Sequence, residues 1–364
     1  MHRVVPAVRR GVVARVLLCA AEASGDQLGA RLAVALNERG IEVFGIAGPA
    51  MRAAGVAAIA RAEDVTALGL VEVVRALPRI RRVLRVVEAA LDTHPACAVG
   101  IDAPGLMSRI GAAARSRRIR TVQWVAPQVW AWNAARAART ATWTDEVLCL
   151  FPFEPLWFRP HGVAATFVGH PLVSVSDVAL PSGSPCVALL PGSRPAEIQR
   201  LWPVLCRVAA ELRRLLPGVR FRVGVAPTVP VEDLGGLVAE RVPGVTAALN
   251  GAHAAVVCSG TAALEVCAAG VPQVVLYQVH PFTWAVGRRL VRVQSLSLPN
   301  LLAGAPIVPE HVQALDPRAI ARDVVRMLGP AGATQVDAIR PSLRGLDSDG
   351  AIARVADRVM GRRG

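Results

Sequence analysis

The sequence contains no lysine, because all 41 residues counted as lysine or arginine are arginines. This absence excludes a Schiff-base lysine and the lysine of a phosphate-binding P-loop. Aromatic residues make up only 4% of the chain, with a single tyrosine. The seven cysteines are widely spaced and form no Cys-x-x-Cys pair, so we expect buried cytosolic thiols rather than disulfides or a zinc site.

Long apolar runs are also missing. The longest, residues 266–279, contains two glutamines and is too short to cross a bilayer, so any membrane contact should be peripheral. Residues 9–21 imitate a secretory signal, but Arg15 interrupts the apolar stretch. We therefore expect a cytoplasmic protein.

The composition bounds the class of protein. A chain of 364 residues that is 53% hydrophobic and 19% charged fits two folded domains rather than disorder. The net charge of +14 indicates an anionic partner, either nucleic acid, an acidic lipid or a phosphorylated substrate. The first strand–helix turn is not a G-x-G-x-x-G fingerprint, which disfavours a dehydrogenase.

Apolar runs alternate with helical spacing along the whole chain. The expected strands are 12–19, 41–47, 97–101, 121–125 and 146–150 in the first half, and 186–190, 221–225, 254–258 and 274–279 in the second. Helices such as 108–118, 133–144, 198–216 and 261–269 separate them. This pattern predicts an α/β fold of two Rossmann-like domains with parallel sheets that face a cleft.

We divide the chain at a linker rich in serine and proline, residues 173–185. The first domain is 1–175 and the second is 176–345. A C-terminal helix, 346–364, could pack back on the first domain.

The first turn holds small and polar residues after a strand. Gly25 allows a tight turn and close approach of a ligand, and Ser24 and Asp26 can cap the following helix, so these three residues are candidates for an acceptor-binding loop. An ordinary strand–helix turn is the simpler interpretation of these residues alone. Asp102 ends an apolar strand, so a parallel sheet would direct it toward the cleft, where it is a candidate general base. Glu22 is the rival for that role.

Two strand–helix junctions in the second half suit a nucleotide. Gly192 and Ser193 offer backbone N–H groups near a helix start, and Arg194 adds a fork of donors for a diphosphate. The second junction consists of Ser259, Gly260 and Thr261, at another helix start, and Glu265, one turn in, could bind ribose hydroxyls. Together they predict a nucleotide-sugar site.

Two further segments are candidates for binding. Asn300, in a segment that spacing alone predicts to be a loop, could bind a phosphate or a sugar hydroxyl. Trp124, Trp130 and Trp132 fall within nine residues, and this tryptophan-rich loop, 124–132, suits a sugar face or acyl chain. No arginine lies between these tryptophans, so nothing beyond net charge favours nucleic acid.

The segment 68–85 alternates apolar residues with five arginines. It could lie on an anionic membrane, because Pro78 should break the helix and leave its apolar flank harder to bury. A core-facing helix with a solvated basic face is the equal alternative. No histidines pair at metal-ligand spacing, so no metal site is expected. His170, near the linker, should have a structural role.

These motifs as a set resemble the lipid-A-disaccharide synthase family. The matching segments are E-A-S-G-D at 22–26, G-I-A-G-P at 45–49, G-I-D-A-P at 100–104, V-W-A-W at 129–132, F-P-F-E at 151–154, G-H-P at 169–171, L-L-P-G-S-R at 189–194, S-G-T-A-A-L-E at 259–265 and S-L-P-N-L-L-A-G at 297–304. They run in order from about residue 14 to residue 315, and the combination is far more specific than any one of them. The chain differs from the family pattern after Pro104 and at Trp124, Ala126 and Gln128.

The resemblance implies a GT-B glycosyltransferase that works at the inner face of the bacterial inner membrane. It would join UDP-2,3-diacylglucosamine to 2,3-diacylglucosamine 1-phosphate, releasing UDP and forming a β-1,6-linked disaccharide without a metal or other cofactor. The first domain would hold the acceptor, with Asp102 as base, and the second would hold UDP, with Arg194, Glu265 and Asn300 in the donor region. A homodimer is a possible assembly.

Other interpretations stay open at this point. The chain could be another GT-B glycosyltransferase or a UDP-sugar epimerase, which needs no acceptor. It could also be a non-catalytic paralogue that binds a nucleotide sugar, or a protein that binds nucleic acid.

Overall fold

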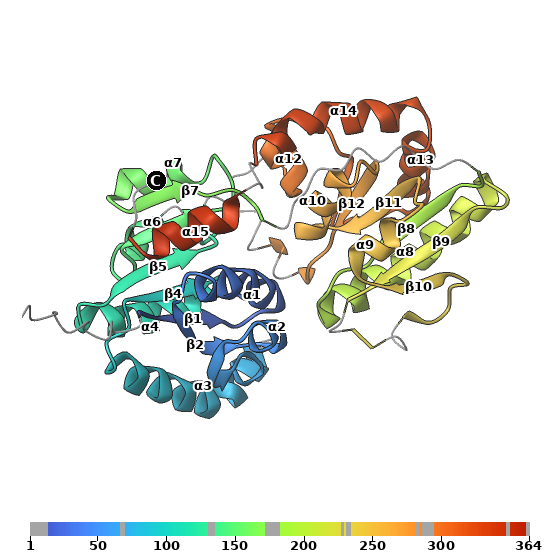
Figure 1. Ribbon diagram of the computed structural model, residues 1–364. Helices are drawn as coiled ribbons and strands as arrows, with labels where there is room; N and C mark the ends of the chain where they lie inside the picture. The colour runs from blue at the N-terminus through green and yellow to red at the C-terminus, as the bar shows by residue number, and fades with distance from the viewer. Residues whose placement is uncertain are drawn as a thin grey trace, which may run out of the picture.

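The structure, a computed structural model, is described here for residues 14–65, 70–129, 135–171, 183–226, 229–230, 234–281, 284–285, 295–346 and 350–361. For 70–77 and 135 only the backbone is described. Figure 1 shows two α/β lobes, the first coloured blue to green and the second yellow to orange. The linker expected at 173–185 lies almost wholly outside the described residues.

The first lobe is built on a parallel sheet whose described strands follow the order β3-β2-β1-β4-β5-β6-β7. These strands are β1 (Arg15–Ala20), β2 (Glu42–Ala47), β3 (Ala57–Arg61), β4 (Cys97–Ile101), β5 (Arg120–Trp124), β6 (Glu146–Cys149) and β7 (Ala164–Phe167). Every pairing is parallel. The carboxyl ends of β1, β4 and β5 therefore meet at one edge.

The second lobe repeats this plan with described strands in the order β10-β9-β8-β11-β12-β13. They are β8 (Cys186–Leu190), β9 (Arg220–Val225), β10 (Glu240–Pro243), β11 (Ala254–Cys258), β12 (Gln273–Tyr277) and β13 (Glu310–Val312). All pairings are again parallel. The prediction of two Rossmann-like halves is confirmed.

Helices cover both faces of each sheet. In the first lobe they are α1 (Ala23–Asn37), α2 (Pro49–Ala53), η1 (Ala62–Asp64), α3 (Leu70–Leu91), α4 (Pro104–Ser116), α6 (Ala135–Thr140), α7 (Pro155–Phe158) and η2 (Arg159–His161). In the rest of the chain they are α8 (Pro195–Leu215), α9 (Gly244–Leu249), α10 (Thr261–Ala268), α12 (Leu298–Ala303), α13 (Pro317–Met327), α14 (Pro330–Arg344) and α15 (Ala351–Val359).

The alternation of side chains along each strand explains the layers. Leu18 of β1 is buried in the same core as Leu32 of α1, whereas its neighbour Leu17 is buried in the core that holds Val87 of α3. Because the central strands are apolar on both sides, each sheet can pack helices on both faces. The buried central strands fix the position of their carboxyl ends, and the polar residues that follow these strands are held in place there.

The chain returns to the first lobe at its C-terminal end. Val355 of α15 is buried in the same core as Leu32 of α1, and Figure 1 shows the red α15 beside the blue and green elements. The Nε of Arg358 donates to the buried carboxylate of Glu146 at 2.7 Å. A buried carboxylate paired in this way is costly to break, so α15 is firmly attached.

The expectation that Pro78 breaks its helix is wrong, because α3 runs without interruption from Leu70 to Leu91. Proline removes one helical hydrogen bond, and Pro78 is exposed, where water can satisfy the freed carbonyl. Within the described part of α3, the apolar side is buried at Val83, Val87 and Leu91.

None of the described helices combines the length and the apolar character needed to cross a membrane.

Candidate active site

The carboxyl ends of β4 and β5 carry unusual backbone conformations. Asp102 and Ala103 follow β4 with φ of 57° and 47°, and Val125 follows β5 with φ of 69°. A positive φ is rare for residues other than glycine and strained for a β-branched side chain. Strain of this kind tends to be retained where a site requires it, so these strand ends are the first candidate for a functional site.

The Asp102 side chain is partly buried and held by two donors. One carboxylate oxygen accepts from the N–H of Ala103 at 2.9 Å, and the other accepts from the hydroxyl of Ser24 at 3.4 Å. Burial raises the pKa of Asp102 and the nearby charge of Glu22 raises it further, while these donors and Arg194 oppose the shift. A carboxylate with a raised pKa in this setting suits general-base work.

An arginine of the second lobe reaches this carboxylate pair. Arg194, which precedes α8, places its guanidinium nitrogen 3.2 Å from the carboxylate of Glu22. The structure therefore brings Glu22, Ser24 and Asp102 of the first lobe together with Arg194 of the second. We call these four residues and Glu197 the junction cluster.

The loop before α8 differs from the expectation of free backbone N–H groups. Both the Ser193 and the Arg194 N–H donate to the Glu197 carboxylate, at 3.1 and 3.2 Å. Gly192 has a φ of 109°, and a Cβ there would lie 2.4 Å from a Glu197 carboxylate oxygen. The loop folds around its own acidic residue, which leaves the Arg194 guanidinium as its main anion-binding group.

The second strand–helix junction lies at the end of β11. The Ser259 hydroxyl donates to the carbonyl of Leu296 at 2.9 Å, and Gly260 precedes α10 in an extended conformation. Thr261 begins the helix, and burial raises the pKa of Glu265 one turn later. The Glu265 carboxylate has no hydrogen-bond partner among the described residues.

The turn after β1 has two structural residues. Neither Ser24 nor Asp26 caps α1 as expected, because α1 already begins at Ala23. Asp26 is 5% exposed and accepts instead from the N–H groups of Ala50 and Met51, at 2.8 and 3.0 Å, which caps α2. A Cβ on Gly25 would lie 2.9 Å from the carbonyl oxygen of Ile101, so glycine permits close packing against β4.

The segment expected to be a loop around Asn300 is a helix, α12, because Ser297 caps its start. Asn300 is buried, and its amide group donates to Val308 and Glu310 at 2.8 and 2.7 Å and accepts from the N–H of Val308 at 2.7 Å. In this structure Asn300 is bound to its own lobe and not to the junction cluster.

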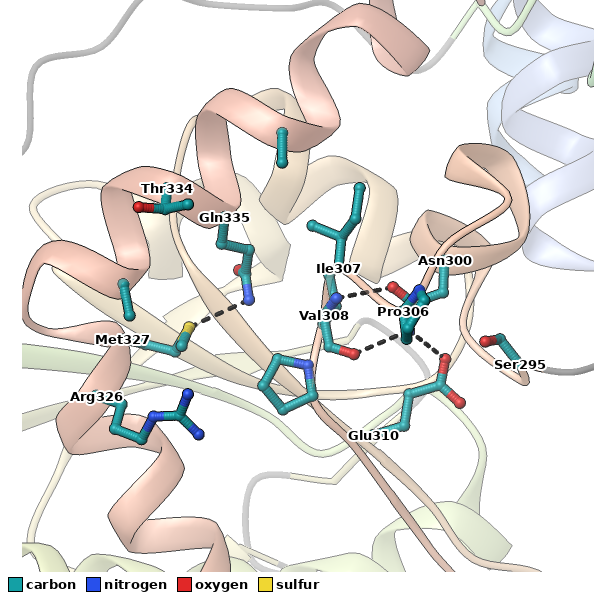
Figure 2. A pocket seen from close by; sticks show the side chains of 13 residues that line it. Ser295, Asn300, Pro306, Ile307, Val308, Glu310, Arg326, Met327, Thr334 and Gln335 are labelled. Carbon is teal, nitrogen blue, oxygen red and sulfur yellow. Dashed lines mark hydrogen bonds between the residues drawn. The ribbon is translucent and has the colours of Figure 1, made fainter.

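Asn300 also lines a pocket of about 710 Å³ at the amino ends of β12 and β13 (Figure 2). Polar groups that line this pocket already make hydrogen bonds within the protein. The Glu310 carboxylate accepts from Ser297, and the Gln335 amide group pairs with the backbone of Gln273. Ligands of parallel sheets bind at the opposite, carboxyl ends of the strands. This pocket is therefore separate from the candidate site.

The tryptophan-rich loop lies only partly within the described residues. Trp130 and Trp132 lie outside the described residues, while Trp124 ends β5 and is fully buried in the core. Trp124 therefore cannot contribute to an aromatic surface. His170 is buried as well, and burial lowers its pKa to about 4, so the ring is neutral near pH 7.

Tyr277, the only tyrosine in the chain, is a further polar group at a strand end that was not predicted. It ends β12, and burial raises its pKa, with Cys258 and Glu197 adding to the shift and Arg194 opposing it. Tyr277 ends an apolar run, as Asp102 does, so the same signal in the sequence could have identified it. In the described part of the chain, no group of three histidine, cysteine or acidic side chains could hold a metal ion.

Comparisons with known proteins identify the family. A model described as lipid-A-disaccharide synthetase matches residues 16–327. The lipid-A-disaccharide synthase of Anaeromyxobacter dehalogenans (strain 2CP-1) is 38% identical over 371 residues, covering 95% of this chain and 97% of the relative. The synthase of the same name from Pseudomonas aeruginosa (strain UCBPP-PA14) is 36% identical over 369 residues, with the same coverage.

Solved structures show the same architecture. The calicheamicin glycosyltransferase CalG4 has a TM-score of 0.62 at 17% identity, covering 96% of this chain and 98% of its own. The UDP-GlcNAc 2-epimerase of Neisseria meningitidis has a TM-score of 0.64 at 11% identity, covering 96% and 100%. At such identities the likeness establishes only the fold, which is GT-B. The sequence match decides the family: the chain belongs to the lipid-A-disaccharide synthetase family and is a glycosyltransferase of lipid A biosynthesis.

Proposed function

We propose that the protein transfers 2,3-diacylglucosamine from its UDP derivative to the 6-hydroxyl of 2,3-diacylglucosamine 1-phosphate, with inversion, to give the β-1,6-linked disaccharide and UDP. The observation that carries the proposal is the junction cluster. Two carboxylates of the first lobe meet an arginine of the second there, so a base for the acceptor and a cation for the leaving diphosphate lie together.

Asp102 takes the proton of the acceptor hydroxyl as its oxygen bonds to the anomeric carbon of the donor. The bond from that carbon to the diphosphate breaks, and its electron pair leaves with UDP. The raised pKa of Asp102 supports this role, because a stronger base accepts the proton more readily. Glu22 is the rival base, and in this structure its carboxylate is paired with Arg194.

Negative charge develops on the departing UDP, and Arg194 is the group placed to bind it. A guanidinium offers several donors in one plane and can hold two phosphate oxygens at once. Interactions that strengthen as the charge forms are those that accelerate the reaction. Ser259 and Gly260 precede α10 and Thr261 begins it, which supplies a second helix start for the nucleotide. The Glu265 carboxylate, which has no hydrogen-bond partner among the described residues, would bind ribose hydroxyls.

The epimerase alternative shares the fold but differs in its need for an acceptor. We expect UDP release from UDP-2,3-diacylglucosamine only when acylated glucosamine 1-phosphate is present, with a disaccharide detected by mass spectrometry. Conversion of a UDP-sugar in the absence of acceptor would support the epimerase instead. DNA binding that weakens steeply with salt, without any UDP release, would favour a non-catalytic protein that binds nucleic acid.

We also propose that α3 helps to hold the protein on the anionic inner face of the bacterial inner membrane. Arg79, Arg81, Arg82 and Arg85 are exposed on α3, while the apolar side chains at Val83, Val87 and Leu91 are buried. The contact would thus rest on charge, at about 1 kcal/mol for each basic residue near the surface.

Binding to vesicles that contain anionic lipid tests this contact. Changing the four arginines of α3 to glutamine should reduce co-sedimentation at low salt. The control changes three exposed arginines of α13, Arg318, Arg322 and Arg326, to glutamine and should have little effect. Losses in proportion to the charge removed, four units in one variant and three in the other, would mean that only net charge matters. The homodimer is a separate prediction, and analytical ultracentrifugation of the purified protein would test it.

A further inference from the structure

Glu197 makes more contacts to the Arg194 loop than a helix cap requires. It lies in the first turn of α8, and one carboxylate oxygen accepts from two successive N–H groups, those of Ser193 and Arg194, at 3.1 and 3.2 Å. Its other oxygen lies 3.6 Å from the Arg194 guanidinium. A single carboxylate therefore fixes both the backbone and the side chain of Arg194.

The loop is shaped to accept this carboxylate. Gly192 has a φ of 109°, and a Cβ at that position would lie 2.4 Å from one Glu197 oxygen and 2.9 Å from its Cβ. Only glycine allows the loop to close so tightly over the acidic side chain. The Glu197 side chain is 25% exposed, so its hydrogen bonds are partly shielded from water.

Arg194 is thus held between two carboxylates, one from each lobe. Glu22 contacts one terminal nitrogen at 3.2 Å, and Glu197 lies nearest the other. The Arg194 side chain is 62% exposed, so the guanidinium keeps donors that face solvent. If a diphosphate replaced Glu22, the contact with Glu197 would still hold the guanidinium in place, because that contact lies within one lobe.

We propose that Glu197 is a positioning residue for the donor: it holds Arg194 in the orientation that binds the UDP diphosphate. This inference rests on the proposed function, in which Arg194 binds that group. The Glu197 carboxylate accepts from the Ser193 and Arg194 N–H groups, so these groups are not free to bind the diphosphate. The Arg194 guanidinium would therefore bind it. The alternative role on the same contacts is that of an occupant of the anion site, which leaves when phosphate arrives.

Three variants separate these roles. Glu197→Ala removes both sets of contacts, and Glu197→Gln keeps an oxygen for the two N–H groups but loses the charge. Glu211→Ala is the matched control, since Glu211 is on the same helix, is 22% exposed and is paired with Arg214 and Arg318. UDP affinity, the KM values for donor and acceptor, kcat and the melting temperature are measured for each.

We expect Glu197→Ala to weaken UDP binding and raise the donor KM about tenfold, as the loss of hydrogen bonds to a charged group implies. The acceptor KM should stay near the wild-type value, and Glu197→Gln should recover most of the donor affinity. Glu211→Ala should lower the melting temperature at most, without changing the donor KM.

Two results would overturn the proposal. Unchanged UDP affinity in Glu197→Ala would reduce Glu197 to a helix cap, and tighter UDP binding would make it an occupant of the anion site. Arg194→Ala tests the proposed function separately. If the wild type binds UDP and Arg194→Ala weakens that binding, failure of the Glu197 variants counts against this inference alone.

Discussion

The ion pair across the junction predicts how Glu22 affects donor binding. Arg194 and Glu22 lie 3.2 Å apart with side chains that are 62% and 45% exposed. Two unit charges at that distance attract by about 1.3 kcal/mol in water, and screening and side-chain entropy leave about 0–1 kcal/mol for such a pair. A diphosphate can therefore displace Glu22 readily.

Glu22→Gln should accordingly tighten UDP binding. The change frees Arg194 and removes a negative charge that repels phosphate, so both effects have the same sign. At most about 1 kcal/mol is regained, which corresponds to about a fivefold lower Kd. Titration calorimetry at low salt measures it, and the gain should nearly vanish in about 1 M salt, where the screening length is about 3 Å.

Glu63→Gln is the matched control, because Glu63 pairs with Arg52 inside the first lobe and changes the net charge equally. It should leave the Kd for UDP unchanged. Weaker UDP binding in Glu22→Gln, or an equal gain in both variants, would refute the reasoning that Glu22 competes with the diphosphate for Arg194.

Three further predictions concern the pH profile, the stability and the metal dependence of the enzyme. Burial raises the pKa of Asp102, so kcat/KM should begin to fall on acidification at a higher pH than it would with an ordinary aspartate as base. Glu22→Gln removes a nearby negative charge and should move this acidic limb of the pH profile to lower pH. An unchanged profile would contradict the electrostatic coupling between Glu22 and Asp102. Asp26→Asn should destabilise the protein by about 2–4 kcal/mol in urea unfolding while the folded enzyme keeps its kcat, because Asp26 caps α2. Activity should survive excess EDTA, because the described residues hold no group of three side chains suited to a metal ion; a complete loss of activity that magnesium restores would contradict this.

The sequence predicted the central strands of both sheets and missed the edges. The strands β4, β8 and β11 have the predicted bounds, because a parallel strand buried on both faces appears as a continuous apolar run. The four edge strands β3, β7, β10 and β13 were not predicted. They are short and partly exposed, so their composition resembles that of loops.

The candidate site divides in the same way. Asp102, Glu22 and Arg194 could be singled out because each follows an apolar strand, and the carboxyl ends of parallel strands meet at one edge. The partner of each side chain could not be predicted. The Glu197 carboxylate accepts from the loop that precedes it, and the Asn300 amide group bonds to Val308 in its own lobe. Both sets of contacts depend on tertiary packing, which the local sequence pattern does not encode.

The Asp26 and Trp124 results have a related cause. Asp26 looked like a cap for the helix in which it lies, yet it caps α2, a neighbour in space. Trp124 looked like part of an aromatic loop, yet it ends β5 and is fully buried. Spacing along the chain identifies which residues are near a strand end, but not which face they occupy.

The most direct test of the account is the turnover of Asp102→Asn, measured with UDP affinity and melting temperature beside it and with Glu22→Gln in parallel. The asparagine keeps the shape of the side chain but cannot take a proton. We predict that kcat falls about a hundredfold or more, while UDP affinity and the melting temperature stay close to wild type. Near-normal turnover in Asp102→Asn, with a strong loss in Glu22→Gln alone, would contradict the account and transfer the base to Glu22.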